Sequence, residues 1–516
     1  MGQDAIHQRL AIRHGSALPP EFEKFTTLPQ LLYQAAQGTH GIFHRLANSL
    51  EATQTYAELL HEAACVLQGL RRLGLQPQDC VILHCSTSRA FLTAFWGCVL
   101  GGFVPVPIAP ALDYSTDNYK TSGLRCAVQS LEQPIILTCQ ALQGAVQEYC
   151  QKFVARFDAT PPLNSDRVVT LDALMMNPPA TEFHAAQPDD LALLLFTSGS
   201  TGVPKGVMLS HRNLLVSMYG MATVNQCSAD AISLNWMPLE HVASLVMFHL
   251  TQVYVGCQQV QVANEVILSE PLKWLDLIDR YRVTHTWAPN FAYGLVSERL
   301  TATQRNWDLS CLRWMGNGAE AVVGKTTRRF LQLLAAYGLG EHTVSPGYGM
   351  SETCSGIVHS HQFSVQTTSD ADAFVEVGQP IPGVSLRIVD AENHLVAEGT
   401  IGRLQVRGET VMQGYYNRPD LNQQVFVDGW LDTGDLGYLN AGRLTITGRQ
   451  KEVIIINGVN YYNHDIEAAV EALSGITVSF TAACAVRRLE DATDQLAIFS
   501  VPIRLPQRQK HRMRKR

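Results

Sequence analysis

The sequence contains few charged residues for its length. Asp, Glu, Lys and Arg together make up 16% of its 516 residues, and the formal net charge is −7. Such a balance gives no reason to expect a nucleic-acid partner. The segment after Pro502 is different, because it holds seven Lys or Arg and no acid. We interpret this basic tail as a solvated terminus, with binding to an anionic surface as the alternative.

Closely spaced cysteine pairs are also lacking. The 12 cysteines are scattered from Cys65 to Cys484, none stands at CxxC spacing to another, and no histidine cluster accompanies them. This pattern argues against a structural zinc site and against a disulfide scaffold. It favours a reducing compartment, so we expect a cytoplasmic protein.

Signals for export and for membrane insertion are weak. The N-terminal stretch MGQDAIHQRL lacks an apolar core, and Ile6 stands where a myristoylation pattern requires Ser or Thr. Residues 91–112 are uncharged for long enough to resemble a membrane span, but they contain Pro105, Pro107 and Pro110. We predict instead a buried helix, a turn at Gly101 and Gly102, and a buried strand.

The length of the chain predicts more than one domain, and its first part alternates helical and strand patterns. Helical spacing of apolar residues occurs at 28–37, 56–74, 271–281 and 326–338. Short apolar strand patterns occur at 80–85, 134–139, 191–198, 223–238 and 283–290. Strands that alternate with helices predict parallel sheets, so the fold class is α/β.

The spacing of the predicted strands and turns changes near Val377. Short strand patterns at 384–390, 402–408 and 442–448 are separated by Gly, Asn and Asp turns, which predicts a small β-barrel-like unit. An amphipathic helix at 464–473 and strands at 481–488 and 496–502 follow. We therefore predict a large N-terminal domain at residues 1–447 and a small α+β C-terminal domain at residues 448–516.

The most informative stretch is TSGSTGVPKG at residues 197–206. Its glycines let the backbone approach an anion, and its hydroxyls and one lysine are donors suited to phosphate oxygens. These are Thr197, Ser198, Gly199, Ser200, Thr201, Gly202, Lys205 and Gly206. The loop is not a Walker A motif, because Gly206 follows Lys205 where Ser or Thr is required. A polyphosphate site is predicted, with a flexible linker as the alternative.

This loop resembles the signature of the adenylate-forming superfamily. That superfamily includes acyl-CoA synthetases, luciferases, fatty acyl-AMP ligases and the adenylation domains of peptide and polyketide synthases. The resemblance implies an ATP- and Mg²⁺-dependent ligase that joins a carboxylate to AMP, releases pyrophosphate and passes the acyl group to a thiol. It covers roughly residues 55–502, with its motifs in the family's order.

Two companion motifs resemble the family's adenine and phosphate segments. By the match of GYGMSETCSG, Tyr348 and Gly349 lie against adenine, Ser351 contacts the α-phosphate and Glu352 is the magnesium ligand. By the match of MGNGAE at 315–320, the adenine site is also lined by Asn317, Gly318, Ala319 and Glu320, mostly through backbone. Without the resemblance, Glu352 is a solvated loop acid and MGNGAE a glycine-rich turn.

The next motifs resemble the ribose and hinge segments. WLDTGDLGYL at 430–439 implies that Asp435 accepts hydrogen bonds from the ribose hydroxyls. GRQKEVIIINGVNYYNHDIE at 448–467 implies that Arg449 reaches the ribose or phosphate, that Lys451 is the hinge, and that Gly458 lies beside the pantetheine thiol.

The acid pocket is expected around NWMPLEHVASLVMF at 235–248. By the resemblance, His241 lies near the substrate carboxylate, although a core histidine is the alternative. Amino-acid-activating relatives usually place an Asp about here, and this stretch has only the neighbouring Glu240. A fatty, aryl or arylpropanoic acid is therefore predicted, with an aromatic pocket wall from Trp287, Phe291 or Tyr293.

The thiol acceptor is expected to be the phosphopantetheine of a separate carrier protein, because NGVNYYNHDIE resembles fatty acyl-AMP ligases and synthase loading domains. Free CoA is the alternative. The family's C-terminal lysine, in a PKxxxGK-like context, has no counterpart here, since only Lys510 and Lys515 follow Lys451. The C-terminal domain therefore looks truncated, and a catalytically impaired nucleotide-binding fragment is a third reading.

Overall fold

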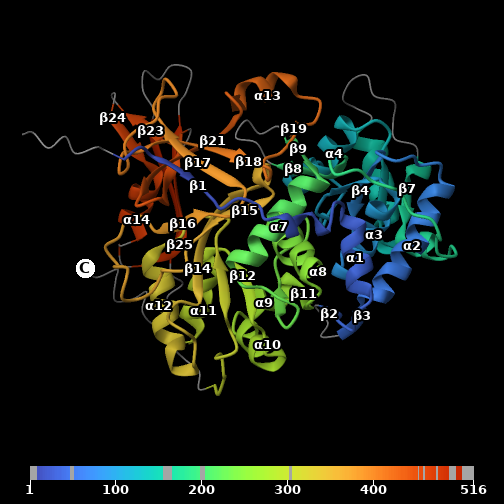
Figure 1. The fold of residues 1–516 in the computed structure, drawn as a ribbon, viewed down its shortest axis with the longest axis horizontal. Helices are drawn as coiled ribbons and strands as arrows, with labels where there is room; N and C mark the ends of the chain where they lie inside the picture. The colour runs from blue at the N-terminus through green and yellow to red at the C-terminus, as the bar shows by residue number, and fades with distance from the viewer. Residues whose placement is uncertain are drawn as a thin grey trace, which may run out of the picture.

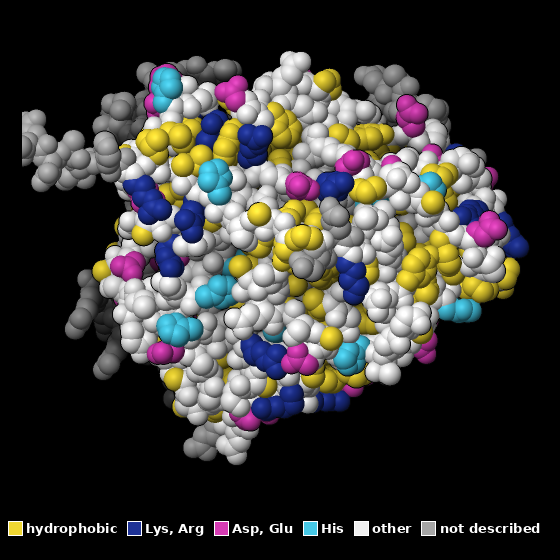
Figure 2. All heavy atoms as spheres, in the orientation of Figure 1, with side chains coloured by type: hydrophobic (Ala, Val, Ile, Leu, Met, Phe, Trp, Pro, Cys, Tyr) yellow, Lys and Arg dark blue, Asp and Glu magenta, His cyan; other side chains and the backbone are white. Residues whose placement is uncertain are grey.

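The computed structural model describes residues 9–46, 51–154, 165–197, 204–300, 305–450, 453–456, 459–471, 473, 475–486 and 495–502. In Figure 1 the N-terminal helices α1–α3 (Leu28–Ala36, Tyr56–Arg72 and Ser88–Gly101) lie at one end of the molecule. The C-terminal strands lie at the other end. On the face drawn in Figure 2, Lys and Arg side chains are spread over several elements rather than gathered in one patch.

A four-stranded parallel sheet forms the N-terminal part, in the order β5-β4-β6-β7. Its strands are Val104–Pro107, Cys80–His84, Ile135–Thr138 and Val168–Thr170. The predicted helix, turn and buried strand are confirmed, because α3 ends at Gly102, whose φ of +70° lets the chain turn into β5. Pro105 and Pro107 are tolerated in β5 because it is an edge strand. Helices α1, α2 and α3 bury one apolar core against this region.

A much larger sheet forms the centre of the molecule. Its parallel part has the order β14-β13-β12-β10-β11-β2, and β3 (Glu51–Thr55) pairs antiparallel with β2. These strands are Val344–Met350, Trp314–Asn317, His285–Ala288, Ile232–Asn235, Gln258–Val262 and Gly41–Arg45. A second apolar core lies beneath helices α10, α11 and α12, which are Lys273–Tyr281, Asn290–Leu300 and Gly324–Leu334. The α/β prediction is confirmed.

Only Ile232–Asn235, a quarter of the strand predicted at 223–238, is a strand in the structure. Thr223 and Val224 end helix α7 (His211–Val224), and the strand is confined to β10. The apolar residues Met218, Met221 and Ala222 are buried in α7, so a helical face extends into a stretch whose short-range pattern resembled a strand. Ser228 to Asp230 then form a turn before β10.

The strand that precedes the predicted phosphate loop is not in a parallel sheet. β8 (Leu191–Thr197) pairs antiparallel with β9 (Lys205–Ser210), which pairs in turn with β19 (Gly414–Tyr415). The expectation of parallel pairing is wrong here because the chain returns directly after the loop instead of crossing over through a helix. The register sets Thr197 opposite Lys205, so both ends of the loop are held together.

The predicted β unit is confirmed as a set of antiparallel strands that continue the large sheet. From the edge inward the order is β1-β17-β18-β21-β22-β16-β15. The strands are Ile12–His14, Val384–Val389, Gly402–Gly408, Trp430–Asn440, Arg443–Arg449, Glu376–Pro380 and Ser355–His359. β15 then pairs antiparallel with β14, so β14 has a parallel neighbour on one side and an antiparallel neighbour on the other.

The last described elements form the predicted small α+β unit. Two strand pairs, β23 with β24 and β25 with β26, accompany helix α14. These elements are Val453–Ile456, Val459–Tyr462, Ile476–Val486, Gln495–Pro502 and Asn463–Glu471. β22 runs across the predicted domain boundary at 447/448, which stays a prediction. Within the described ranges, no helix is long and apolar enough to cross a membrane.

Candidate functional site

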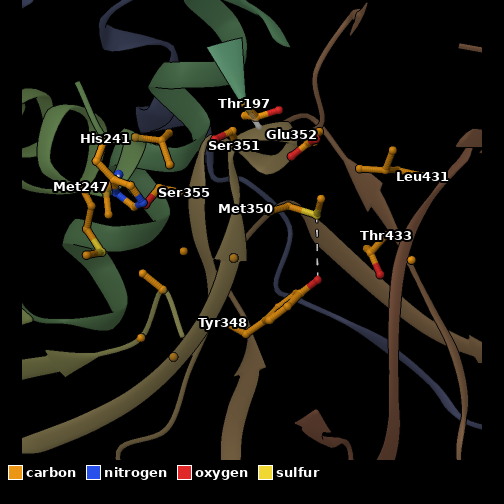
Figure 3. Close-up of a pocket in the computed structure, with 18 of the residues that line it drawn as sticks. Thr197, His241, Met247, Tyr348, Met350, Ser351, Glu352, Ser355, Leu431 and Thr433 are labelled. Carbon is orange, nitrogen blue, oxygen red and sulfur yellow. Dashed lines mark hydrogen bonds between the residues drawn. The ribbon is translucent and has the colours of Figure 1, made fainter. Parts of the chain in front are cut away.

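A cavity of about 960 Å³ lies where β13, β14 and β15 meet β9, β19 and β21. Parallel sheets bind ligands beyond the carboxyl ends of their strands, and this cavity lies at such an edge. Figure 3 shows three groups of side chains around it: His241, Met247 and Ser355; Thr197, Ser351 and Glu352; and Tyr348 with Thr433. The roles that the resemblance implies for these residues give the names used below, which are the acyl end, the phosphate end and the nucleoside end.

At the nucleoside end, three predicted residues form one hydrogen-bonded group. The Tyr348 hydroxyl donates to Asp435 Oδ2 at 2.6 Å, and Arg449 Nε donates to Asp435 Oδ1 at 3.1 Å. Asp435 and Arg449 are opposite one another on β21 and β22. Tyr348 and Arg449 line the cavity. Asp435 is 6% exposed and is hydrogen-bonded to both of these residues. The structure therefore brings together residues from three separate motifs.

The protonation state of this group follows from its surroundings. Burial, together with the Asp435 carboxylate, holds the pKa of Tyr348 well above its usual value. Tyr348 therefore stays a hydroxyl donor at neutral pH, and Arg449 Nε lies 3.1 Å from Asp435 Oδ1 in an ion pair.

At the phosphate end, Tyr415 connects two predicted residues. Glu352 lies in a short turn at Ser351–Thr353, is nearly buried, and accepts a hydrogen bond from the Tyr415 hydroxyl at 2.8 Å. Lys205 Nζ lies 5.0 Å from the centroid of the same ring. Burial and the Glu352 carboxylate raise the pKa of Tyr415, so its hydroxyl stays protonated. Sequence reasoning missed Tyr415, which lies in none of the motifs that carried the resemblance.

The other predicted phosphate-loop residues are only partly described. Thr197, Lys205 and Ser351 line the cavity. The loop residues Ser198, Gly199, Ser200, Thr201 and Gly202 lie outside the described residues, as do Lys451 and Gly458. The described part therefore places two hydroxyls, one lysine and one carboxylate at the same end of the cavity.

The segment predicted beside adenine divides into two parts. Asn317, Gly318 and Ala319 line the cavity, together with Gly349. Glu320 is not part of the wall, because its carboxylate accepts the backbone N–H of Phe291 at 2.6 Å, at the start of α11. Burial raises the Glu320 pKa, and the Phe291 N–H opposes that rise. Glu320 therefore lies where a carboxylate stabilises the N-terminus of a helix.

At the acyl end, aromatic rings form an ordered stack. His241 stacks on Trp287, Trp287 on Phe248 and Phe248 on Trp314, with centroid separations of 5.9–6.0 Å and interplanar angles of 23–27°. His241 precedes a π-helix at Ala243–Leu250, and its Nδ1 accepts the Ala243 N–H at 3.3 Å. Rings stacked in this way favour contact with other flat groups.

The individual predictions for the acyl end have different outcomes. His241 faces the cavity rather than the core, and surrounding protein lowers its pKa, so the ring is neutral at pH 7. Trp287 lines the cavity as predicted, but Tyr293 is fully buried and donates to the Gly316 carbonyl at 2.7 Å. Phe291 packs edge-on against Trp236. The sequence pattern alone could not separate wall from core aromatics.

Acidic residues are confined to the other two ends of the cavity. Among the described residues of its wall, Glu352 lies at the phosphate end, and Asp432 pairs with Arg403 next to Thr433. No described Asp or Glu lines the acyl end. Glu240 stays outside the wall, and burial raises its pKa. The acyl end is therefore neutral and largely aromatic.

The donor set at the phosphate end fits a hard dication that is shared with phosphate. Among the described residues, no group of three or more His, Cys, Asp or Glu could hold a metal ion alone. Glu352 supplies one carboxylate, which is the number that Mg²⁺ typically takes from a protein when phosphate oxygens and water complete its octahedron. Lys205 supplies a compact positive charge suited to a phosphate.

Comparison with known proteins identifies the class of enzyme. Residues 35–416 match the family model described as "AMP-binding enzyme", and the chain belongs to this family. It is 34% identical over 463 residues to the nonribosomal peptide synthetase apvA of Aspergillus terreus (strain NIH 2624 / FGSC A1156), covering 88% of this chain and 49% of that protein. It is 33% identical to the microperfuranone synthase of Emericella nidulans, covering 93% and 51%. The chain thus spans about half the length of the curated relatives that it matches.

Solved structures agree with this assignment. The adenylation domain of a keto acid-selecting nonribosomal peptide synthetase module, bound to keto acyl adenylate, is 39% identical with a TM-score of 0.82, and the match covers 97% of this chain and 95% of that one. McyG A-PCP complexed with phenylalanyl-adenylate is 38% identical with a TM-score of 0.88, covering 98% and 78%. The chain is an adenylate-forming ligase of the adenylation-domain type, and it activates a carboxylic acid.

Proposed function

We propose that this enzyme activates an aryl or arylpropanoic acid that carries no α-ammonium group. The observation that carries the proposal is the acyl end of the cavity, which presents Trp287 and Trp314 and no described carboxylate. An ammonium group bound there would lose its hydration without gaining a counter-ion, which costs several kcal/mol. Of the acid classes predicted from sequence, the flat rings favour aryl and arylpropanoic acids over fatty acids.

The similar solved structures bear on this choice in opposite directions. The keto acid-selecting domain is bound to an acyl group without an ammonium, whereas McyG A-PCP is complexed with an amino-acid adenylate. The neutral acyl end of this chain supports the first type. A 2-oxo acid with an aryl group therefore belongs to the proposed class, beside the simple arylpropanoic acids.

The proposed reaction uses the three ends of the cavity together. A carboxylate oxygen of the acid attacks the α-phosphorus of ATP, the bond from that phosphorus to the bridging oxygen breaks, and pyrophosphate leaves. Mg²⁺ held by Glu352 would offset charge on the phosphates, together with donors from Lys205, Thr197, Ser351 and the loop 198–202. Neutral His241 would orient the carboxylate.

The nucleoside would be held at the nucleoside end of the cavity. Tyr348, Gly349 and residues 317–319 would contact adenine, and Asp435 with Arg449 would bind the ribose. Glu320 would act only indirectly, by holding the start of α11.

The second half-reaction would transfer the acyl group to the phosphopantetheine thiol of a carrier protein. The thiol sulfur attacks the acyl carbon, the acyl–phosphate bond breaks, and AMP leaves. Support comes from the similar McyG structure, which contains a carrier-type domain with its adenylation domain. Lys451 as hinge and Gly458 beside the thiol stay predictions, as does the boundary at 447/448. Free CoA as acceptor, and a binding-only fragment, are the alternatives.

The first half-reaction is tested by ATP–pyrophosphate exchange with acids matched in shape. We would compare 3-phenylpropanoate, phenylpyruvate, phenylalanine and decanoate at equal concentration with Mg²⁺. The expected result is exchange with the first two at a kcat/KM at least about 10-fold above that with phenylalanine, because the ammonium would be buried unpaired. A preference for phenylalanine would refute the substrate class.

The acceptor is tested separately. Radiolabelled acid would be incubated with ATP and either a panel of phosphopantetheine-loaded carrier proteins or free CoA, and thioester formation would be measured. Labelling of a carrier but not of CoA is the expected result. Exchange without any thioester would remove the transfer step from the proposal, and ATP binding without exchange would favour the binding-only fragment.

A further inference from the structure

The floor of the acyl end contains polar atoms that have no partner in the protein. Among the described residues, thirteen buried side-chain nitrogen or oxygen atoms lack a hydrogen bond, and four of them belong to residues that line the cavity. They are Trp314 Nε1, Asn317 Oδ1, Ser345 Oγ and His359 Nδ1. Buried polar atoms are usually paired, so a concentration of unpaired ones in a cavity indicates that a ligand or water pairs with them.

Three of these residues lie on the same face of the sheet. Gly316 pairs with Ser345, and Gly347 pairs with His359, across neighbouring strands. Because side chains alternate along a strand, Trp314 shares the face of Gly316, and Ser345 shares the face of Gly347. Asn317 belongs to the opposite face, where its amide nitrogen donates to Asn290 and Thr327. The floor is therefore made by Trp314, Ser345 and His359.

Two glycines make room for the large rings of this floor. A Cβ at Gly316 would lie 2.5 Å from Trp314 Cη2, and a Cβ at Gly347 would lie 2.8 Å from His359 Nδ1. A side chain at either position would displace a ring, so the rings occupy the space that those side chains would otherwise fill. His359 and Trp314 meet edge to face, with centroids 5.8 Å apart.

The tautomer of His359 follows from its other ring nitrogen. His359 Nε2 lies 3.0 Å from Met221 Sδ, and a thioether sulfur can only accept a hydrogen bond. Nε2 therefore carries the proton, and Nδ1 presents a lone pair. Burial lowers the pKa of His359 to about 3, and His361 nearby adds to the effect, so the ring is neutral at pH 7. The unpaired atom of His359 is an acceptor.

We propose that the acyl end selects an acid with a hydroxyl group at the end far from its carboxylate, and that this hydroxyl donates to His359 Nδ1. The inference rests on the proposed function and narrows it to ring-hydroxylated aryl or arylpropanoic acids. The hydroxyl oxygen would accept a hydrogen bond from Ser345 Oγ or Trp314 Nε1, the two donors on the same floor. A neutral hydroxyl suits the site, because no described charge lines the acyl end.

The experiment compares acids that differ only at the ring. We would measure kcat/KM in ATP–pyrophosphate exchange for 3-phenylpropanoate, its 3-hydroxyphenyl and 4-hydroxyphenyl analogues, and its 4-fluorophenyl analogue as a size control. One hydroxylated acid is expected to exceed the unsubstituted and fluorinated acids at least about 10-fold, since its absence leaves buried polar atoms unpaired. Equal values for all four acids would overturn the inference and would mean that the floor holds water only.

Variants of the floor identify the atom that is responsible. His359→Phe should abolish the ratio of kcat/KM between the hydroxylated acid and 3-phenylpropanoate, and His359→Asn should restore part of that ratio through an amide oxygen. His285→Phe is the matched control, because His285 also packs on Trp314, 6.4 Å between centroids, but hydrogen-bonds through both nitrogens and does not line this cavity. An unchanged preference in His359→Phe would overturn the assignment to His359.

Two further measurements keep the inference separate from the proposed function. If no acid supports exchange, the proposed function fails, and binding of the same four acids is then followed by tryptophan fluorescence. Tighter binding of a hydroxylated acid would still support the inference, whereas equal or absent binding would overturn it. If His359→Phe does not fold, Ser345→Ala replaces it, with a loss of preference of about threefold expected.

Discussion

The nucleoside and phosphate ends of the cavity differ from the acyl end in how their polar groups are satisfied. Tyr348, Asp435 and Arg449 form one hydrogen-bonded group, and at the phosphate end Tyr415 donates to Glu352 and has Lys205 over its ring. At the acyl end, the polar atoms of the floor are unpaired and lie among aromatic rings. In the proposed function, the protein would pre-organise the site for the invariant co-substrate, whereas the site that would choose the acid leaves hydrogen bonds for the substrate to complete.

This difference has a physical consequence for mutations. Charged groups at the phosphate end act on the charge that develops as pyrophosphate leaves, so their loss should reduce the rate with every acid. Groups at the acyl end act on the ground state and transition state of particular acids, so their loss should change the choice of acid. The predictions below test this division, beginning with the largest expected effect.

The strongest test of the comparison is Glu352→Gln. The amide keeps an oxygen that can accept from Tyr415, so the fold should survive, but the negative charge for Mg²⁺ is lost. We expect exchange to fall by about 10²–10³ for all acids alike, as for other electrostatic groups in active sites. The measurement is exchange as a function of Mg²⁺ concentration.

Its control is Glu270→Gln, which changes a surface carboxylate paired with Lys273. That variant should match the wild type. Full activity of Glu352→Gln, or a loss confined to one acid, would contradict the assignment of Glu352 to the metal.

A smaller effect is expected at the nucleoside end. Asp435→Asn weakens the pairing with Arg449 and the acceptor for the ribose while it keeps a bond from Tyr348. We expect the KM for ATP to rise about 10-fold, because a charge-assisted hydrogen bond is worth about 1.5–3 kcal/mol, and the KM for the acid to stay unchanged. Steady-state exchange at varied ATP and varied acid distinguishes the two constants.

Asp420→Asn is the matched change, since Asp420 pairs with Arg418 on the surface. It should leave both constants unchanged. A rise in the KM for the acid in Asp435→Asn would indicate that the two ends of the cavity are coupled rather than separate.

The smallest effect concerns stability and pH at the acyl end. The pKa of His359 falls from 6.5 in the unfolded chain to about 3 in the folded protein through burial. Above pH 6.5 both states are neutral, and below it only the unfolded state takes up the proton, so acid destabilises the fold. Below pH 6.5, the free energy of unfolding of the wild type should therefore fall by up to about 1.4 kcal/mol per pH unit more than that of His359→Phe.

The measurement is urea unfolding of both proteins between pH 8 and pH 5. Above pH 7 the difference between the two proteins should be constant, which serves as the internal control. Below pH 6.5 the wild type should lose stability faster than the variant. Parallel curves throughout would show that His359 is protonated in the folded protein, contrary to a lone pair at Nδ1.

The predictable part of the site lies in continuous motifs on strands and their turns. The turn after β14 and the hairpin of β21 and β22 each hold several predicted site residues within a few positions of one another. Local geometry is enough there, so Lys205, Glu352, Tyr348, Asp435 and Arg449 were found by their motifs and are brought to one cavity. The alternation of helices and strands likewise predicted the α/β class.

The failures have a common cause, which is that pairing partners are not encoded locally. The antiparallel partner of β8 depends on the return of the chain after the loop, and the strand predicted at 223–238 begins inside α7 because that helix buries its apolar face. Tyr293 and Trp287 come from the same predicted pocket segment and are both buried, yet only Trp287 lines the cavity.

The sequence by itself determined the family and the type of ligase, and its short contiguous motifs predicted the residues that would surround phosphate and ribose. Only the tertiary structure decided the acyl end. Trp314, Ser345 and His359 lie on three different strands, and the register of β13, β14 and β15 places them on one face beside two glycines. They lie close together because strands far apart in the sequence pair with one another. No short sequence pattern can specify such pairing.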